Sequence, residues 1–166
     1  MSYRCHACQQ EHDDPPMSFH AEAPESYARV PEAEREARCD LATDQCVIDD
    51  EHCFVRGLIE IPVIGLEEPL VWGVWVSLSL RNFGRAHELW NTEGREAEPP
   101  CFGWLNTELA PLYPSTLSLA TNVHTRPVGV RPLVEVQASD HPLAVEQQRG
   151  ISRDRLHEIW STLLHD

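Results

Sequence analysis

The strongest fold signal in the sequence is the apolar run from Leu70 to Leu80, which reads LVWGVWVSLSL. Its first half is apolar on both faces, and its second half alternates apolar residues with Ser77 and Ser79. This pattern predicts a central strand that is buried on both faces where it begins and half exposed where it ends. The run is too short to cross a bilayer, which takes roughly 20 apolar residues.

The segments around this strand predict further strands and helices. Strands are expected at 45–49 and 52–56, joined as a hairpin at Asp50-Glu51, and again near 116–124 and 131–137. A two-residue hairpin loop would place Cys46 and Cys53 on the same face of the sheet. Helices are expected at 31–38, 82–90 and 142–150 and after the capping residue Ser152. Residues 91–115 carry four prolines, which predicts a long irregular connection.

These elements predict a single α+β domain over residues 1–166. Its core, residues 40–166, is expected to be a mostly antiparallel sheet with helices packed on one side. Residues 1–25 hold prolines, histidines and a CxxC motif. We therefore expect a metal-binding N-terminal segment that resembles a zinc knuckle.

The charge of the chain excludes some classes of partner. The 166 residues include 27 acids against 13 arginines and no lysine, which gives a formal net charge of −14. Such a field repels phosphate backbones and anionic lipid, so we expect neither nucleic acid nor a membrane surface as a partner. The N-terminus has no apolar stretch typical of a signal peptide, and a cytoplasmic location is expected. There, six cysteines are thiols or metal ligands more often than disulfides.

Cys5 and Cys8 form the CxxC motif, and His12 follows four residues later. Two thiolates at this spacing can bind one zinc ion from a tight turn. Further ligands can come from His12, His20, Cys39, Cys46, Cys53 or an acid. Cys46 is favoured because it begins a strand, where its side chain can face a neighbouring loop. The hypothesis is a zinc site made by Cys5, Cys8, His12 and Cys46.

Two alternatives remain for the CxxC motif. The pair can be free thiols at the surface of a frayed N-terminus, or a redox-active pair. The redox alternative lacks the βαβ pattern in which thioredoxin-type motifs occur.

A second group of polar residues offers candidate ligand-binding side chains. It consists of Arg95, His124, Arg126, Asp140, His141 and Glu146. A guanidinium can bind a carboxylate or phosphate in a bidentate manner, and Asp140 can orient His141 for acid–base work. The simpler interpretations are an internal ion pair for Arg126 and a helix cap for Asp140. No nucleophile elbow, P-loop or dinucleotide motif is present.

Several stretches together resemble a known group of bacterial proteins. They are Asp44–Ile48, Arg56–Val63, Trp72–Leu78, Phe102–Leu105, His124–Pro127 and Asp140–Gln147. Nearly the whole chain resembles the family named domain of unknown function 2199 (DUF2199). The family pattern opens with CxxCGxxH, which matches Cys5, Cys8 and His12, with Gln9 in place of the glycine. Cys46 also matches a family cysteine, so the resemblance supports the same four ligands and implies no activity.

Three functions follow as hypotheses. The first is a small protein with structural zinc that binds a protein partner or a small ligand. The second is an enzyme that uses the His/Arg/Asp/Glu group in one pocket. The third is an acidic immunity-type or inhibitor-type protein, which requires the acids to gather on one face.

Overall fold

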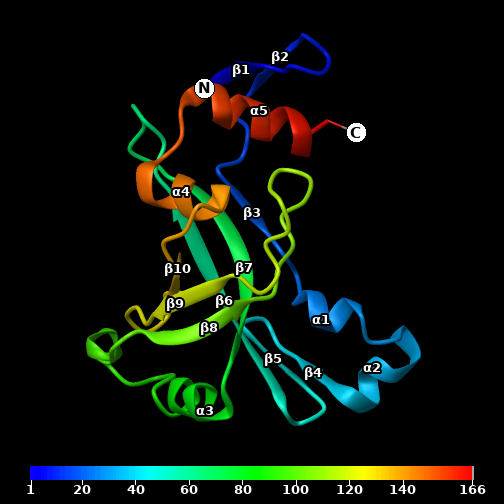
Figure 1. Ribbon diagram of the computed structural model, residues 1–166, viewed down its shortest axis with the longest axis vertical. Coiled ribbons are helices and arrows are strands. Elements are labelled where there is room, and N and C mark those ends of the chain that lie inside the picture. Colours follow the sequence, from blue (N-terminus) through cyan, green and yellow to red (C-terminus); the bar gives the residue numbers. More distant parts are fainter. Residues whose placement is uncertain (166) are drawn as a thin grey trace.

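The protein, described over residues 1–165 by a computed structural model, is built around a closed five-stranded β-barrel (Figure 1). The barrel strands are β6 (His52–Ile61), β7 (Leu70–Leu78), β8 (Cys101–Leu105), β9 (Ala120–His124) and β10 (Leu133–Val136). Consecutive strands pair antiparallel from β6 to β10. The barrel closes where β10 pairs with β6 in parallel, at Leu133 and Leu58.

Further strands extend the barrel sheet at its two long strands. β3 (Ser18–His20) pairs in parallel with β7. β5 (Gln45–Ile48) pairs with β6, and β4 (Cys39–Leu41) pairs with β5. β1 (Ser2–Arg4) and β2 (Glu11–Asp13) form a separate antiparallel hairpin. The eight-stranded sheet is therefore mixed, with two parallel pairings.

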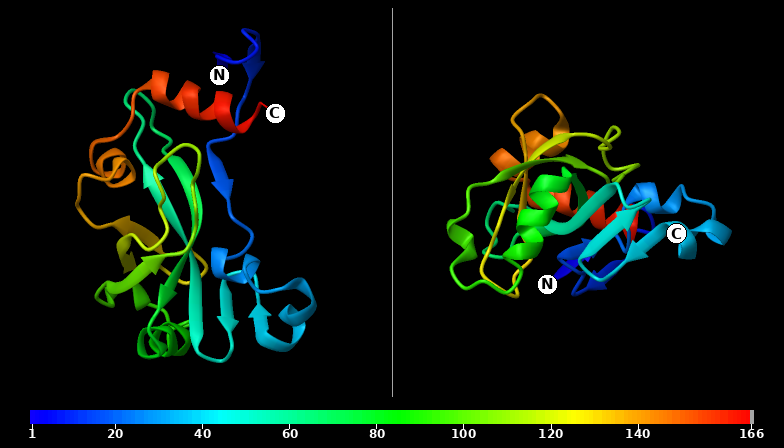
Figure 2. Two further views of the ribbon diagram at one scale, coloured as in Figure 1. Left: turned by 45° about the vertical axis from the view of Figure 1, so that its right-hand side comes forward. Right: turned by 90° about the horizontal axis from the view of Figure 1, so that it is seen from below.

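The helices lie at different places around the barrel. α5 (Arg153–Leu163) crosses one end, beside α4 (Pro142–Arg149), and α3 (Leu80–Glu88) lies at the opposite end (Figures 1 and 2). α1 (Glu25–Ala28) and α2 (Glu32–Arg38) lie beside β4, and a 3₁₀ turn spans Arg95–Ala97. Among residues 1–165, none of the helices has the length and apolar character needed to cross a bilayer.

The predicted fold class was wrong. The prediction was a mostly antiparallel sheet with helices on one side, whereas the structure is a closed barrel with a mixed sheet and helices at both ends. Two features caused the error. β8 lies inside the segment 91–115, which its prolines marked as irregular. Closure depends on one parallel pairing between β10 and β6, residues far apart in the sequence that no local periodicity connects.

Most individual elements were predicted correctly. β7 occupies the quoted run, and α5 follows the Ser152 cap, whose side chain accepts a hydrogen bond from the Arg155 amide. The hairpin before β7 differs in one detail: Cys46 pairs with Phe54 rather than with Val55, the partner that a two-residue loop would give it. The loop therefore has three residues rather than two, and Cys46 and Cys53 face opposite sides of the sheet.

Two clusters of buried side chains follow from this arrangement. The larger cluster fills the barrel and extends under α4 and α5, where Leu143, Leu156 and Trp160 are buried. The smaller cluster lies on the outer face of β5, β6 and β7 and includes Cys46, Phe54 and Trp75. The N-terminal hairpin joins the larger cluster through Tyr3 and Cys5.

Candidate functional site

The CxxC motif lies in the turn that joins β1 to β2. The Cys5 amide donates a hydrogen bond to the Gln10 carbonyl, and the Gln9 amide donates one to the Cys5 carbonyl, both at 2.9 Å. Gln9 has a φ of 62°, a left-handed conformation that favours glycine. Glycine, which the family pattern has at this position, adopts such a conformation more readily than glutamine.

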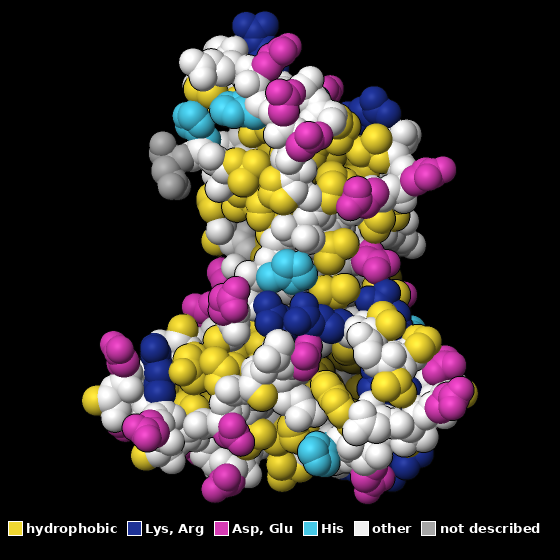
Figure 3. Space-filling model, turned by 180° about the vertical axis from the view of Figure 1, so that it is seen from behind, with side chains coloured by type: hydrophobic (Ala, Val, Ile, Leu, Met, Phe, Trp, Pro, Cys, Tyr) yellow, Lys and Arg dark blue, Asp and Glu magenta, His cyan; other side chains and the backbone are white. Residues whose placement is uncertain are grey.

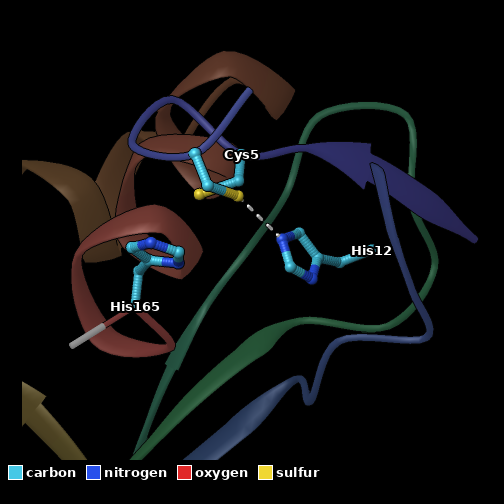
Figure 4. A group of neighbouring side chains, drawn as sticks. Cys5, His12 and His165 are labelled. Atoms are coloured by element: carbon cyan, nitrogen blue, oxygen red, sulfur yellow. Dashed lines mark hydrogen bonds between the residues drawn. The ribbon is translucent and has the colours of Figure 1, made fainter. Parts of the chain in front are cut away.

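Four side chains in this region bring potential metal-ligating atoms together. Cys5, Cys8, His12 and His165 each offer one atom, and these atoms all lie within 4.8 Å of one another. Cys8 Sγ is 3.2 Å from His12 Nε2. Figure 4 shows His165 approaching the hairpin from the chain that follows α5, opposite His12. The group therefore unites the two ends of the described chain.

These separations suit a tetrahedral metal ion. Ligands at about 2.3 Å for sulfur and about 2.0 Å for nitrogen lie roughly 3.3–3.8 Å apart around a tetrahedral ion. Cys5 is fully buried, Cys8 and His12 are partly buried, and His165 is exposed. The cluster can hold a metal ion after small side-chain adjustments.

Local hydrogen bonds favour the thiolate of Cys5. The backbone amide of Cys8 has the largest effect in lowering the pKa of the Cys5 thiol, followed by smaller contributions from the Ala7 amide and Ser161. Burial acts in the opposite direction but is outweighed. The Ala7 amide lies 3.4 Å from Cys5 Sγ. Because a thiolate is the form that binds metals, the turn prepares Cys5 for this role.

The hairpin is attached to the barrel through α5. The Tyr3 ring stacks on His12, with centroids 5.5 Å apart, and packs against Trp160 at 5.0 Å. The His6 amide donates to Ser161 Oγ at 2.9 Å, and Trp160 Nε1 donates to the Pro16 carbonyl at 2.9 Å. The helix that crosses one end of the barrel, α5, therefore also supports the cluster.

Cys46, the fourth ligand expected from the sequence, is not brought to this group. It is fully buried on β5 in the smaller cluster, and burial raises the pKa of its thiol to about 12. Figure 1 shows β5 at the end of the molecule opposite to the β1–β2 hairpin. His165 takes the place of Cys46 as the fourth potential ligand.

The other candidate residues separate into distinct groups. His124 contacts Glu135 at 3.2 Å, and Arg126 pairs with Glu60 at 2.9 Å. Arg95 donates hydrogen bonds to backbone carbonyls, including those of residues 126, 127 and 130. Arg126 thus forms an internal ion pair, which was the simpler interpretation. The hydrogen bonds of Arg95 hold the loop after β9 in place.

The remaining three lie around α4. His141, rather than Asp140, caps the helix, because its Nδ1 accepts a hydrogen bond from the Leu143 amide at 3.1 Å. Glu146 accepts hydrogen bonds from Tyr113 and from Arg155. Among the described residues, His124, Arg126 and Glu146 pair with three different side chains, so the six candidates form no single acid–base constellation.

A cavity of about 890 Å³ lies between the end of the barrel and α3. Its walls come from β6, β8, α3 and the loop 125–132. Arg95 and Arg126 line it, together with Arg56, a residue that the sequence reasoning did not single out. Its volume falls within the range of about 300–1,000 Å³ that is typical of small-molecule sites.

Little in the sequence indicates that His165 or Arg56 belongs to a candidate site. His165 is one of nine histidines, and no spacing rule connects it with His12. Arg56 lies among mostly apolar residues of β6, and an arginine at such a position is a weak indication of function.

The family comparison matches the resemblance found in the sequence. The model of the family described as "Uncharacterized protein conserved in bacteria (DUF2199)" matches residues 4–151, which include Cys5, Cys8, His12 and Cys46 but not His165. No curated protein and no solved structure matched the chain. The match extends over most of the 166 residues, and the chain therefore belongs to the DUF2199 family.

Proposed function

We propose that the protein binds one zinc ion at Cys5, Cys8, His12 and His165, and that this ion stabilises the fold of a small ligand-binding protein. The observation that carries the proposal is the convergence of two thiols and two imidazoles within 4.8 Å. Two thiolates and two imidazoles are a ligand set typical of structural zinc.

The chemistry of the ligand set favours zinc over other metals. Thiolates disfavour magnesium and calcium, which prefer oxygen ligands. Mixed sulfur and nitrogen ligands in a tetrahedral arrangement suit zinc. Four protein ligands leave no open position for a substrate or water, which supports a structural rather than a catalytic role.

The position of the cluster supports the same role. The ion would join a short hairpin to the segment after α5, and the hairpin alone has only three residues in each strand. An isolated two-stranded hairpin is marginally stable in water. Metal binding would therefore hold the hairpin and α5 together, alongside the packing of Tyr3 on Trp160.

The cavity at the other end of the barrel favours a small ligand over a protein partner. It has the volume of a small-molecule site, and it combines apolar walls with charged groups. The acidic inhibitor hypothesis has less support, since on the face shown in Figure 3 the acids are scattered among other side chains.

Metal content tests the zinc part of the proposal. Protein purified without added chelator should contain one zinc ion per chain by elemental analysis. The double variant Cys5→Ser/Cys8→Ser should contain none and should melt at a lower temperature. Cys39→Ser is the matched control, because it removes a thiol from outside the cluster and should retain the metal. Absence of stoichiometric zinc from the wild type would refute this part.

A further inference from the structure

The cavity at the α3 end of the barrel has a positive lining in an acidic protein. Five arginines and two carboxylates line it, which gives the lining a formal net charge of +3. The chain as a whole carries −14. Figure 3 shows arginine side chains gathered beside a histidine at the middle of one face. The positive charge is thus concentrated locally.

Most of these arginines already have partners. Arg85 pairs with Glu98 at 2.8 Å, and Arg131 pairs with Asp44 at 2.7 Å. Arg126 pairs with Glu60, and Arg95 donates to backbone carbonyls. These four side chains are held in place by the protein itself.

Arg56 is different. It is only 8% exposed, and within residues 1–165 it forms no ion pair with a carboxylate. Its Nη1 donates to the Thr43 carbonyl at 3.1 Å, and its guanidinium lies 5.7 Å from the centre of the Trp75 ring. Its Nε is buried without a hydrogen-bond partner. A buried guanidinium normally has a carboxylate or a full set of acceptors, because desolvating the charge is costly.

The charges of Arg56 and Arg131 act together on a neighbouring side chain. Burial, and then the charges of Arg56 and Arg131, lower the pKa of His20. Arg56 lines the cavity, and an anion that meets its guanidinium there would lie away from bulk water, where a charge-assisted hydrogen bond is strong.

The rest of the cavity wall is apolar. Leu58, Leu78, Leu89, Trp90, Phe102 and Val130 are among the lining residues. They belong to β6, β7, β8, the α3 segment and the loop after β9. Such a wall suits the hydrocarbon or aromatic body of a ligand rather than a second charged group.

We infer that the cavity binds a small organic anion with an apolar body, whose carboxylate or phosphate pairs with Arg56. This inference rests on the proposed ligand-binding function and names the class of ligand. Leu89, Trp90 and the loop 125–132 would cover the apolar body, while the Arg56 guanidinium would hold the anionic head.

Four ten-carbon probes test the inference: decanoate, decyl phosphate, 1-decanol and decylamine. Binding to the zinc-loaded full-length chain can be measured below the micellar range by calorimetry and by tryptophan fluorescence, since Trp75 and Trp90 lie near the site. At least one of the two anions should bind at least tenfold more tightly than decanol, and decylamine should bind most weakly. The preferred anion distinguishes a carboxylate from a phosphate ligand.

Variants assign the preference to Arg56. Arg56→Met should weaken binding of the preferred anion at least tenfold and leave decanol binding unchanged, while Arg56→Lys should retain part of the preference. Arg149→Met, which removes an exposed arginine outside the cavity, is the control. The comparison of probes on the wild type remains decisive if Arg56→Met fails to fold.

The outcomes separate this inference from the proposed function. Equal binding of decanol and the anions, with no effect of Arg56→Met, would overturn the inference and leave a cavity that binds uncharged ligands. Failure of all four probes to bind the wild type would overturn both the inference and the ligand-binding part of the proposed function.

Discussion

The fourth metal ligand offers the sharpest test of the structure, because the sequence and the tertiary arrangement favour different residues. The sequence and the family resemblance suggest Cys46, whereas the structure brings His165 to Cys5, Cys8 and His12. His165→Ala should therefore reduce the stabilisation that zinc provides, whereas Cys46→Ala should leave it unchanged.

The magnitude follows from linkage between binding and folding. An ion that binds only the folded state stabilises it by RT ln(1 + [L]/Kd), about 4 kcal/mol at a free zinc concentration 1,000 times Kd. Loss of one ligand that weakens binding about a hundredfold would reduce this increment to roughly 1.4 kcal/mol at the same zinc concentration. For a chain of this size, each kcal/mol corresponds to about 2–4 °C in melting temperature.

The expected results form a series. With the wild type, buffered zinc should raise the free energy of unfolding by about 4 kcal/mol over the metal-free protein. His165→Ala should keep roughly a third of this increment, and Cys5→Ser should abolish it. Cys46→Ala should keep all of it, although removal of a fully buried side chain will lower the stability of the metal-free and metal-bound forms alike.

Urea unfolding in zinc buffers and in chelator measures these increments directly. Each variant is compared with itself, with and without zinc, so that general destabilisation cancels. The reasoning would be refuted if Cys46→Ala lost the zinc increment while His165→Ala retained it. That result would mean that the chain end does not reach the hairpin in solution.

Three further predictions concern the CxxC turn, the end of α4 and stability in acid. Gln9→Gly should stabilise the metal-free protein by about 0.5–1 kcal/mol in urea unfolding, because residue 9 has a left-handed backbone. Gly150→Ala should destabilise it by about 2–3 kcal/mol, since φ is 81° and a Cβ would lie 2.9 Å from the Pro62 carbonyl oxygen. Hydrogen bonds from Arg85 hold the pKa of Glu98 below its ordinary value of 4.5. Their contribution is complete above that value and is lost as pH falls through the lowered pKa, so Arg85→Met should make the loss of stability in acid shallower.

The first two predictions have control variants, and the third has an outcome that would contradict it. Gln10→Gly changes the neighbouring residue of the same turn, which is not among the residues with positive φ, and should not stabilise. Gly129→Ala changes a glycine whose φ is also positive but whose Cβ would meet nothing within 4 Å, so it should cost less than Gly150→Ala. If the stability of Arg85→Met falls in acid as steeply as that of the wild type, Glu98 contributes no measurable stability through its pair with Arg85.

The sequence by itself determined the local elements. The apolar run of β7 and the periodic stripe of α5 produced a strand and a helix because the residues that bury each face recur at the period of that element. The CxxC turn was equally readable, since both thiols lie within one short hairpin. Local sequence was sufficient wherever the partners of a residue lie within one element or one turn.

Only the tertiary structure decided the closure of the barrel and the completion of the candidate sites. β10 meets β6, His165 meets Cys5, and Arg56 lines a cavity with residues from α3 and the loop after β9. These contacts join segments far apart in the chain, and their formation depends on the packing of the whole core rather than on any local pattern. For the same reason, the arginine whose charge lacks a carboxylate partner could be recognised only once its neighbours were in place.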